Sequence, residues 1–260
     1  MPWTFSHPAA ALAFAPIRKK PREFAALVIV CISPDIGYYL GSAGLNLRTH
    51  SLIGSVKLCL PMGLATLLFL MLLRAPLCQL LPTPHRQALL PMVKADMQTG
   101  LKSWLRICAW ILIGAWTHIA WDACTHRTGL VVQFLPMLQG NGLFGLPVYQ
   151  LAQHLSSAFG GLIILVAYTR WLRQQLIINI DDGFERWRWR LVMTSLAIAL
   201  LIALPHALSL ANAAPTALFW RVLMFQFAIR STSVFAILIV LSALWLFFRI
   251  RKAVSRPIAS

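Results

Sequence analysis

Residues 104–129, WLRICAWILIGAWTHIAWDACTHRTG, combine an apolar helix with three residues that are able to bind a metal ion. These residues are His118, Asp122 and His126, each four positions from the next. Four residues of an α-helix turn about 40° past one full turn, so the spacing predicts that the three side chains share one helix face. Ionisable residues in membrane segments are costly and usually mark a functional site. The sequence therefore predicts a polar, metal-competent face on a membrane helix.

The composition of the whole chain is that of an integral membrane protein. Of its 260 residues, 59% are hydrophobic and 12% are charged, which is about half the charged fraction of soluble proteins. Six apolar runs approach the roughly 20 residues that a helix needs to cross hydrocarbon. They are Phe24–Leu40, Ile53–Leu73, Trp104–Asp122, Leu155–Leu172, Leu191–Leu210 and Thr232–Phe248. The predicted fold class is all-α, a polytopic bundle of about six transmembrane helices in the lipid bilayer.

The basic residues alternate in number along the connections between these runs. Four precede the first run and four follow the last. Five lie between the second and third runs or at their facing ends, and five lie between the fourth and fifth runs or at their facing ends, whereas the other connections hold few. By the positive-inside rule, the rich connections are cytoplasmic and the sparse ones face outward. The net charge of +16 is thus explained by membrane orientation. Because the charges form no basic stripe on a soluble domain, no nucleic-acid partner is predicted.

The short apolar stretch at residues 5–17 has two possible arrangements. It is either a helix on the cytoplasmic membrane surface or a short helix that pairs with Phe24–Leu40 as a hairpin. The hairpin is favoured, and because His7 and Asp35 are equally distant from Pro21, it would bring both side chains to the same outward depth.

Acidic residues are rare at the outward ends of the runs, and histidines are common there. Only Asp35 and Asp122 lie at outward ends, since the other five acids fall in cytoplasmic connections. Histidines collect at the same outward ends: His7, His50, His118, His126, His154 and His206. Imidazole and carboxylate at one depth fit a divalent ion, Zn²⁺ first and Mn or Fe as alternatives. The five cysteines lack CxxC spacing and are predicted to be small apolar side chains.

The helix itself limits how many ligands one ion can take. The α-carbons of His118 and His126 are roughly 12 Å apart in a regular helix, so one ion bound by both of them and Asp122 would be strained. Either one of the three orients a ligand, or the cluster holds two or more ions. A different interpretation is that the polar face only bonds neighbouring helices together.

Five motifs occur in a characteristic order: MPWTFSHPAA, SPDIGYYL, THSLIG, HIAWDACTHRTG and LPVYQLAQHLSSAFGG. In this order they resemble the bacterial membrane-protein family called domain of unknown function 4184, over residues 1–175. Residues 1–175 are therefore expected to form the recognised membrane domain, and residues 176–260 to add C-terminal helices packed on it. Within that addition, residues 212–231 are expected to form an outward re-entrant or interfacial segment.

The chain is more distantly similar to membrane-bound proteins described as metal-dependent hydrolases. This resemblance implies a set of metal ligands, namely His7, Asp35, His50, His118 and Asp122, with His126 and His154 as further candidates. Here the relatives' His-Arg-Gly before Thr-His-Ser is replaced by NLR, which places Arg48 two residues before His50.

Two functions follow from these predictions. The first is a metal-dependent hydrolase at the outer face of the bacterial inner (cytoplasmic) membrane, which cuts a phosphoester or similar bond in a lipid-linked or periplasmic substrate. Asp35 or Asp122 would act as base or bridging ligand, and Arg48 or Arg127 would hold the anionic substrate. The second is a non-catalytic membrane protein that binds metal or uses the cluster structurally. A transporter is disfavoured because the polar residues crowd one end of the helices instead of the midplane.

Overall fold

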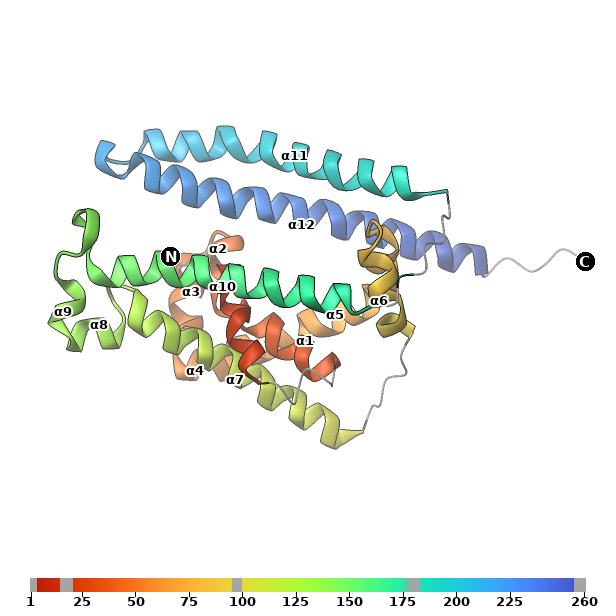
Figure 1. The fold of residues 1–260 in the computed structure, drawn as a ribbon, viewed down its shortest axis with the longest axis horizontal. Coiled ribbons are helices and arrows are strands. Elements are labelled where there is room, and N and C mark those ends of the chain that lie inside the picture. Colours follow the sequence, from red (N-terminus) through yellow and green to blue (C-terminus); the bar gives the residue numbers. More distant parts are fainter. Residues whose placement is uncertain (1–3, 15–20, 95–99, 176, 178–182, 255–260) are drawn as a thin grey trace, which may run out of the picture. The chain divides into compact units, whose positions relative to one another are not determined.

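The computed structural model describes residues 4–14, 21–94, 100–175, 177 and 183–254. These residues form helices joined by turns, with no β-strand among them (Figure 1). Five helical segments of the described chain are long and apolar enough to cross a membrane: Leu52–Leu80, Leu101–Phe134, Val148–Arg173, Glu185–Asn212 and Thr216–Ile250. The predicted all-α, multi-pass membrane fold is confirmed.

The chain forms two compact units, the first from residues 1–69 and 96–174 and the second from residues 70–95 and 175–260. The first unit opens with η1 (Thr4–Ala13), α1 (Pro21–Val30), η3 (Ser33–Asp35), α2 (Ile36–Tyr39), α3 (Ala43–Thr49), α4 (Leu52–Gly54) and the π-helical turn η4 (Ser55–Cys59). It closes with α7 (Leu101–Thr125), α8 (Leu130–Phe134), α9 (Pro136–Gln139), η5 (Leu143–Gly145) and α10 (Val148–Arg173). Helix α5 (Leu60–Leu80) begins in the first unit and ends in the second.

Helix α1 packs directly on α7, because a glycine lets the two backbones come close and a glutamate of α1 forms hydrogen bonds with side chains of α7. A Cβ atom at Gly114 would lie 2.8 Å from the carbonyl oxygen of Leu27, so only glycine allows the two backbones to come this close. Away from this contact, Glu23 of α1 accepts hydrogen bonds from Nε of Arg106 at 2.8 Å and Nε1 of Trp110 at 3.2 Å. These contacts fix the position of α1 along α7.

The N-terminal segment η1 is held against α10 by a similar close approach. A Cβ atom at Gly160 would lie 2.9 Å from the carbonyl oxygen of Ser6, and the Ser6 hydroxyl donates to the carbonyl oxygen of Ser157 at 2.8 Å. Thr4 of η1 also donates to the carboxylate of Asp35 at 2.6 Å. The hairpin interpretation predicts that the N-terminal segment and Asp35 lie together, and this hydrogen bond joins them. The predicted turn between them falls largely outside the described residues.

The first predicted apolar run, Phe24–Leu40, is not one continuous helix, which corrects the sequence prediction. Helix α1 ends at Val30, and the chain continues through a turn into η3 and α2. The cause is Pro34, which has no N–H to donate and whose ring disfavours α-helical backbone in the residue before it. The break leaves Asp35 buried inside the first unit.

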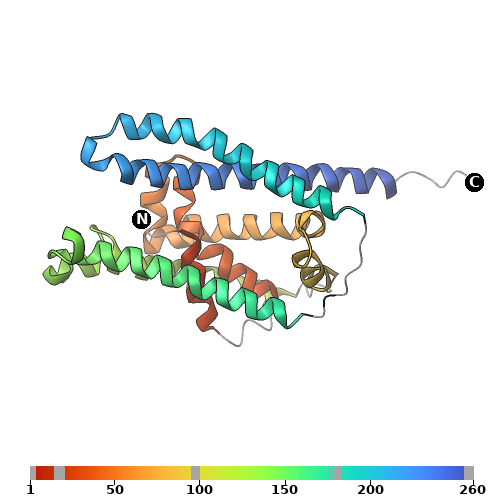
Figure 2. The ribbon, with the colours of Figure 1, turned by 45° about the horizontal axis from the view of Figure 1, so that its top comes forward.

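The second unit is built around a helical hairpin of α11 (Glu185–Asn212) and α12 (Phe219–Val254), joined through η6 (Thr216–Leu218). The two helices lie side by side in both views (Figures 1 and 2). Fully buried alanines recur every fourth residue along α11, at Ala199, Ala203, Ala207 and Ala211. Such small residues let membrane helices approach closely.

The structure also corrects the prediction for residues 212–231. These residues were expected to form a separate re-entrant or interfacial segment, yet residues 219–231 are the first turns of the 36-residue helix α12. In the same unit, Glu185 accepts from the backbone N–H of Thr83 at 2.8 Å, and Nε of Arg188 donates to the carbonyl oxygen of Gln79 at 2.8 Å. These bonds connect α11 to the end of α5 and the turn that precedes α6 (His85–Lys94).

The close approach at Gly114 predicts a large effect of one added methyl group. We expect Gly114→Ala to lower the stability of the protein by about 1–3 kcal/mol, because the new Cβ would press on the backbone of Leu27. The matched control is Gly44→Ala in α3, where a Cβ meets nothing within 4 Å. Thermal unfolding in detergent measures both, and equal melting temperatures would contradict the tight α1–α7 contact.

Candidate metal centre

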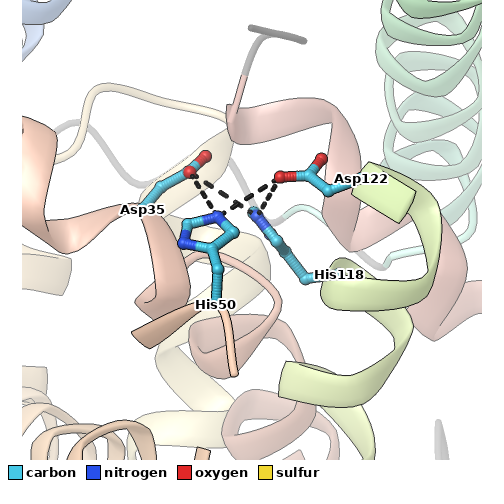
Figure 3. Close-up of side chains that lie close together, drawn as sticks. All are labelled: Asp35, His50, His118 and Asp122. Carbon is cyan, nitrogen blue, oxygen red and sulfur yellow. Dashed lines mark ion pairs between the residues drawn. The ribbon is translucent and has the colours of Figure 1, made fainter. Parts of the chain in front are cut away.

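Four predicted ligands meet at one point inside the first unit (Figure 3). They are Asp35, His50, His118 and Asp122, and one atom from each lies within 4.8 Å of the other three. Asp35 lies at the end of η3, His50 follows α3, and the other two lie one helical turn apart on α7. Three segments that are distant in sequence thus supply one cluster, as the distribution of acids and histidines predicted.

Imidazole nitrogens and carboxylate oxygens alternate around the cluster. Nε2 of His50 lies 3.4 Å from Oδ1 of Asp35 and 3.2 Å from Oδ2 of Asp122. Nε2 of His118 lies 3.5 Å and 3.3 Å from the same two oxygens. Zn²⁺ binds such atoms at about 2.0–2.2 Å, and a tetrahedron of that size has edges of about 3.3–3.6 Å. The four nitrogen–oxygen distances therefore match the edge length of a tetrahedral metal site, and all four donor atoms lie within 4.8 Å of one another.

His118 is oriented by the helix break that the sequence prediction missed. In a continued α-helix, the N–H of Asp35 would bond the carbonyl oxygen of Cys31, but it bonds Ile32 at 3.1 Å instead. The carbonyl oxygen of Cys31 is free to accept from Nδ1 of His118 at 2.7 Å. Because a carbonyl oxygen only accepts, Nδ1 carries a proton, and Nε2 is the ring nitrogen that faces the carboxylates.

His50 is oriented in the same way from the other side of the cluster. Its Nδ1 donates to the carbonyl oxygen of Asn46 at 2.7 Å. The preceding residue, Thr49, donates to the carbonyl oxygen of Pro34 at 2.6 Å, which fixes the end of α3 against η3. The residues of the THS motif thus have separate tasks, and Ser51 caps the next helix by accepting from the N–H of Gly54 at 3.0 Å.

The charges around His50, which precedes the first membrane-length helix, favour a cation in the cluster. Burial acts to lower the pKa of His50, but its contacts with the carboxylates of Asp122 and Asp35 outweigh burial and raise the pKa to about 9. Without an added proton or metal ion, the Nε2 lone pairs of His50 and His118 would face carboxylate oxygens, and both groups would be hydrogen-bond acceptors. A proton on each ring or a metal cation between the four atoms removes this conflict.

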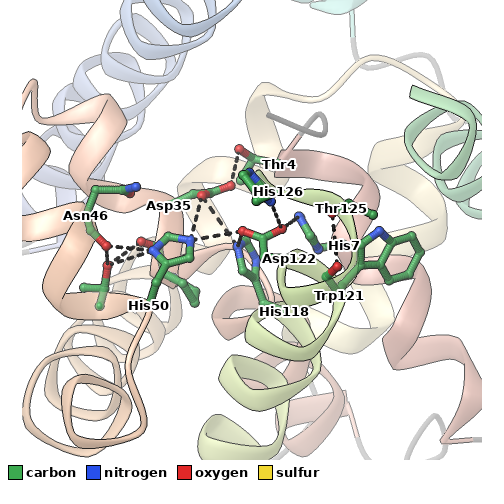
Figure 4. A network of polar contacts seen from close by, with 12 residues as sticks. Thr4, His7, Asp35, Asn46, His50, His118, Trp121, Asp122, Thr125 and His126 are labelled. Atoms are coloured by element: carbon green, nitrogen blue, oxygen red, sulfur yellow. Dashed lines mark hydrogen bonds and ion pairs between the residues drawn. The ribbon is translucent and has the colours of Figure 1, made fainter. Parts of the chain in front are cut away.

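His7 and His126 lie on the other side of Asp122 (Figure 4). Oδ1 of Asp122 is 3.3 Å from Nδ1 of His126 and 3.7 Å from Nε2 of His7. The ring of His7 stacks on that of His118, with 3.8 Å between centroids. His126 was predicted to lie on the helix face, but α7 ends at Thr125 and His126 has extended backbone. The N–H of His126 still bonds the carbonyl oxygen of Asp122 at 3.0 Å, so the four-residue spacing brings this ring to Asp122 although the helix ends one residue earlier.

The remaining predicted site residues are outside this group. His154 is exposed on α10, and the structure does not bring it into the cluster. Arg48 and Arg127 are exposed as well, and no hydrogen bond or ion pair between described residues joins them to the cluster. Their assignment as substrate-binding residues stays a prediction.

Two residues that support the cluster were not among the predicted site residues. Thr4 donates to Oδ2 of Asp35, and it shares a side with His7 because residues three apart align in a 3₁₀-helix. The amide nitrogen of Gln153 lies 3.4 Å from Nε2 of His126. A usable signal was the spacing of Gln153, Ser157 and Gly160, which places them on one face of α10.

The chain matches the family model "Domain of unknown function (DUF4184)" over residues 1–244. This match covers nearly the whole chain and continues beyond residue 175, where the recognised motifs end. The chain therefore belongs to this family. No curated protein and no solved structure matches it.

The bond from Thr4 to Asp35 gives a test of the cluster as a metal centre. We expect Thr4→Val, which keeps the side-chain shape, to weaken Zn²⁺ binding about 10–100-fold because Asp35 loses the donor that orients it. The matched control is Thr169→Val, since Thr169 is on α10 and its hydroxyl donates to the carbonyl oxygens of Leu165 and Val166 of the same helix. Competition with a chromophoric chelator measures the affinity. Unchanged affinity in Thr4→Val would mean that Asp35 is not a ligand.

Proposed function

We propose that this family member is a membrane-bound metal-dependent hydrolase. Its metal would be held by Asp35, His50, His118 and Asp122, with Zn²⁺ as the first choice and Mn or Fe as alternatives. The observation that carries the proposal is the ring of alternating donors with edges of 3.2–3.5 Å. A supporting observation is that Oδ1 of Asp35 and Nε2 of His118 are buried without a hydrogen-bond partner in the described structure, which a bound cation would supply.

The chemistry assigns distinct tasks to the residues of the cluster. A bound divalent ion lowers the pKa of a coordinated water and polarises the bond to be cut. Cys31 and Asn46 supply the carbonyl oxygens that hold the two imidazoles with Nε2 inward. Asp35 and Asp122 offset the charge of the ion and are the nearest carboxylates to accept a released proton.

Other acids do not compete for the role of base among the described residues of this unit. Glu23 belongs to α1, where it binds Arg106 and Trp110. Water activation in the proposed reaction therefore depends on the metal together with the two carboxylates of the cluster.

The proposed substrate is an anionic phosphoester with an apolar part, such as a lipid-linked compound. The segment that follows His126 exposes large apolar side chains, with Leu130 64%, Phe134 77%, Met137 74% and Leu143 71% exposed. Exposed apolar groups of this kind suit a lipid surface or an amphiphilic ligand. Arg48 and Arg127 would pair with the phosphate. By the distribution of basic residues, we place this end of the helices at the outer face of the bacterial inner membrane.

The alternative function is metal binding without hydrolysis. Four protein ligands fill a tetrahedral site, as in structural zinc centres, whereas catalytic centres keep a position for water. The two functions differ in turnover and share the metal, so separate measurements distinguish them.

Metal content tests the site itself. We expect purified wild-type protein to retain Zn²⁺ after dialysis, and His118→Asn to bind it more than about 100-fold more weakly, since even the loss of a residue that only orients a ligand costs about 10–100-fold. Asparagine keeps a donor near the position of Nδ1 for the carbonyl of Cys31 and removes the Nε2 ligand. His206→Asn on α11, where the histidine is exposed, is the control. Equal metal content in all three proteins would refute the metal centre.

Turnover tests the hydrolase. We expect the wild-type protein to hydrolyse chromogenic phosphomonoesters and phosphodiesters or vesicle-embedded lipid phosphoesters, with loss of activity in chelator and in His118→Asn and full activity in His206→Asn. Product release is followed by absorbance or phosphate assay. A loaded wild-type protein that turns over no member of this panel would favour the non-catalytic function.

A further inference from the structure

We propose that the cluster holds two metal ions, with Asp122 bridging them and with His7 and His126 as the imidazole ligands of the second ion. This inference rests on the proposed metal centre and adds a second position to it. The second ion would lie beside Oδ1 of Asp122, on the side away from His50.

The two oxygens of Asp122 face different sets of imidazoles. Oδ2 lies 3.2 and 3.3 Å from Nε2 of His50 and His118. Oδ1 lies 3.3 Å from Nδ1 of His126 and 3.7 Å from Nε2 of His7. Two ligands that each lie about 2.1 Å from one ion are at most about 4.2 Å apart, so both contacts of Oδ1 are short enough to span an ion. A carboxylate that divides its oxygens between two such sets has the arrangement of a bridging ligand.

His7 gives an independent observation, because it is buried and its ring nitrogens have no hydrogen-bond partner among the described residues. Its side chain is 2% exposed, and neither ring nitrogen makes a hydrogen bond in the described structure. Leaving one buried polar group without a partner costs about 1–3 kcal/mol. The separation of 3.7 Å from Asp122 is too long for a direct hydrogen bond, whereas a shared ion would satisfy both residues.

The surroundings hold His7 in this position. Its ring stacks on His118 and meets the edge of Trp121, with 5.6 Å between centroids. On either side of it in the segment, Thr4 and Ser6 are bonded to Asp35 and to α10, and Pro8 is buried. A histidine that is fixed this firmly and points at a carboxylate oxygen is preorganised for an ion.

His126 completes the set and leaves the second position open. Nδ1 of His126 and Oδ1 of Asp122 are also buried without hydrogen-bond partners. The structure has the amide nitrogen of Gln153 3.4 Å from Nε2 of His126. Rotation of this amide by 180° would turn its oxygen to Nε2, where it would accept the ring proton and leave Nδ1 to bind metal. Three protein ligands leave room for a water, which the four-ligand position lacks and which catalytic zinc centres keep.

Metal stoichiometry tests the second position separately from the hydrolase. Mass spectrometry of Zn²⁺ in full-length protein should give two ions per chain in the wild type and one in His7→Asn and His126→Gln. Glutamine keeps a polar group near Nε2 of His126, and the rest of this ring is partly exposed, with 25% of the side chain accessible, so this variant should fold even if the His7 variant does not. His206→Asn should retain two ions.

A second readout uses Mn²⁺ in place of Zn²⁺. Two ions that share Asp122 should give an exchange-coupled electron paramagnetic resonance spectrum in the wild type and an uncoupled six-line spectrum in His126→Gln. One ion per wild-type chain, or two ions in both histidine variants, would overturn the second position and leave the hydrolase proposal standing. Two coupled ions without turnover of any phosphoester would support the second position and refute the hydrolase.

Discussion

Two carboxylates that face the same two imidazole nitrogens are the constraint on which the first unit depends. Asp35 is 1% and Asp122 is 7% exposed, and burying two negative charges side by side is strongly unfavourable unless a cation or proton offsets them. The histidines around them cannot turn away, because backbone carbonyls hold Nδ1 of both His50 and His118. The fold therefore forces negative charge into one small volume that requires positive charge in return.

The convergence of this site could be predicted because polar residues in a membrane helix carry unusually clear information. Lys and Arg alone set the orientation, and Asp35 and Asp122 were then the two acids left at outward ends. The helical spacing of His118 and Asp122 was also correct. These predictions use charge and periodicity, which a single sequence contains in full.

Other parts of the site depend on tertiary contacts that periodicity does not encode. The run Phe24–Leu40 looked like one helix because apolar composition concealed the effect of Pro34, and His126 was expected on a helix that in fact ends one residue earlier. Thr4 and Gln153 support the cluster because η1 and α10 lie beside it, and only the spacing on α10 had a signal in the sequence. Hydrophobic patterning thus located the helices, while helix ends and 3₁₀ turns determined which atoms meet.

The interrupted helix has a consequence for how such a protein can change over time. The break before Asp35 frees the carbonyl of Cys31, and the imidazole of His118 is its donor. An apolar residue in place of that imidazole would leave the buried carbonyl oxygen of Cys31 without a donor, and this would lower the stability of the first unit. Substitutions of His118 that remove the donor would therefore destabilise the fold as well as the cluster. We expect a hydrogen-bond donor to persist at this position even in descendants that no longer use the cluster.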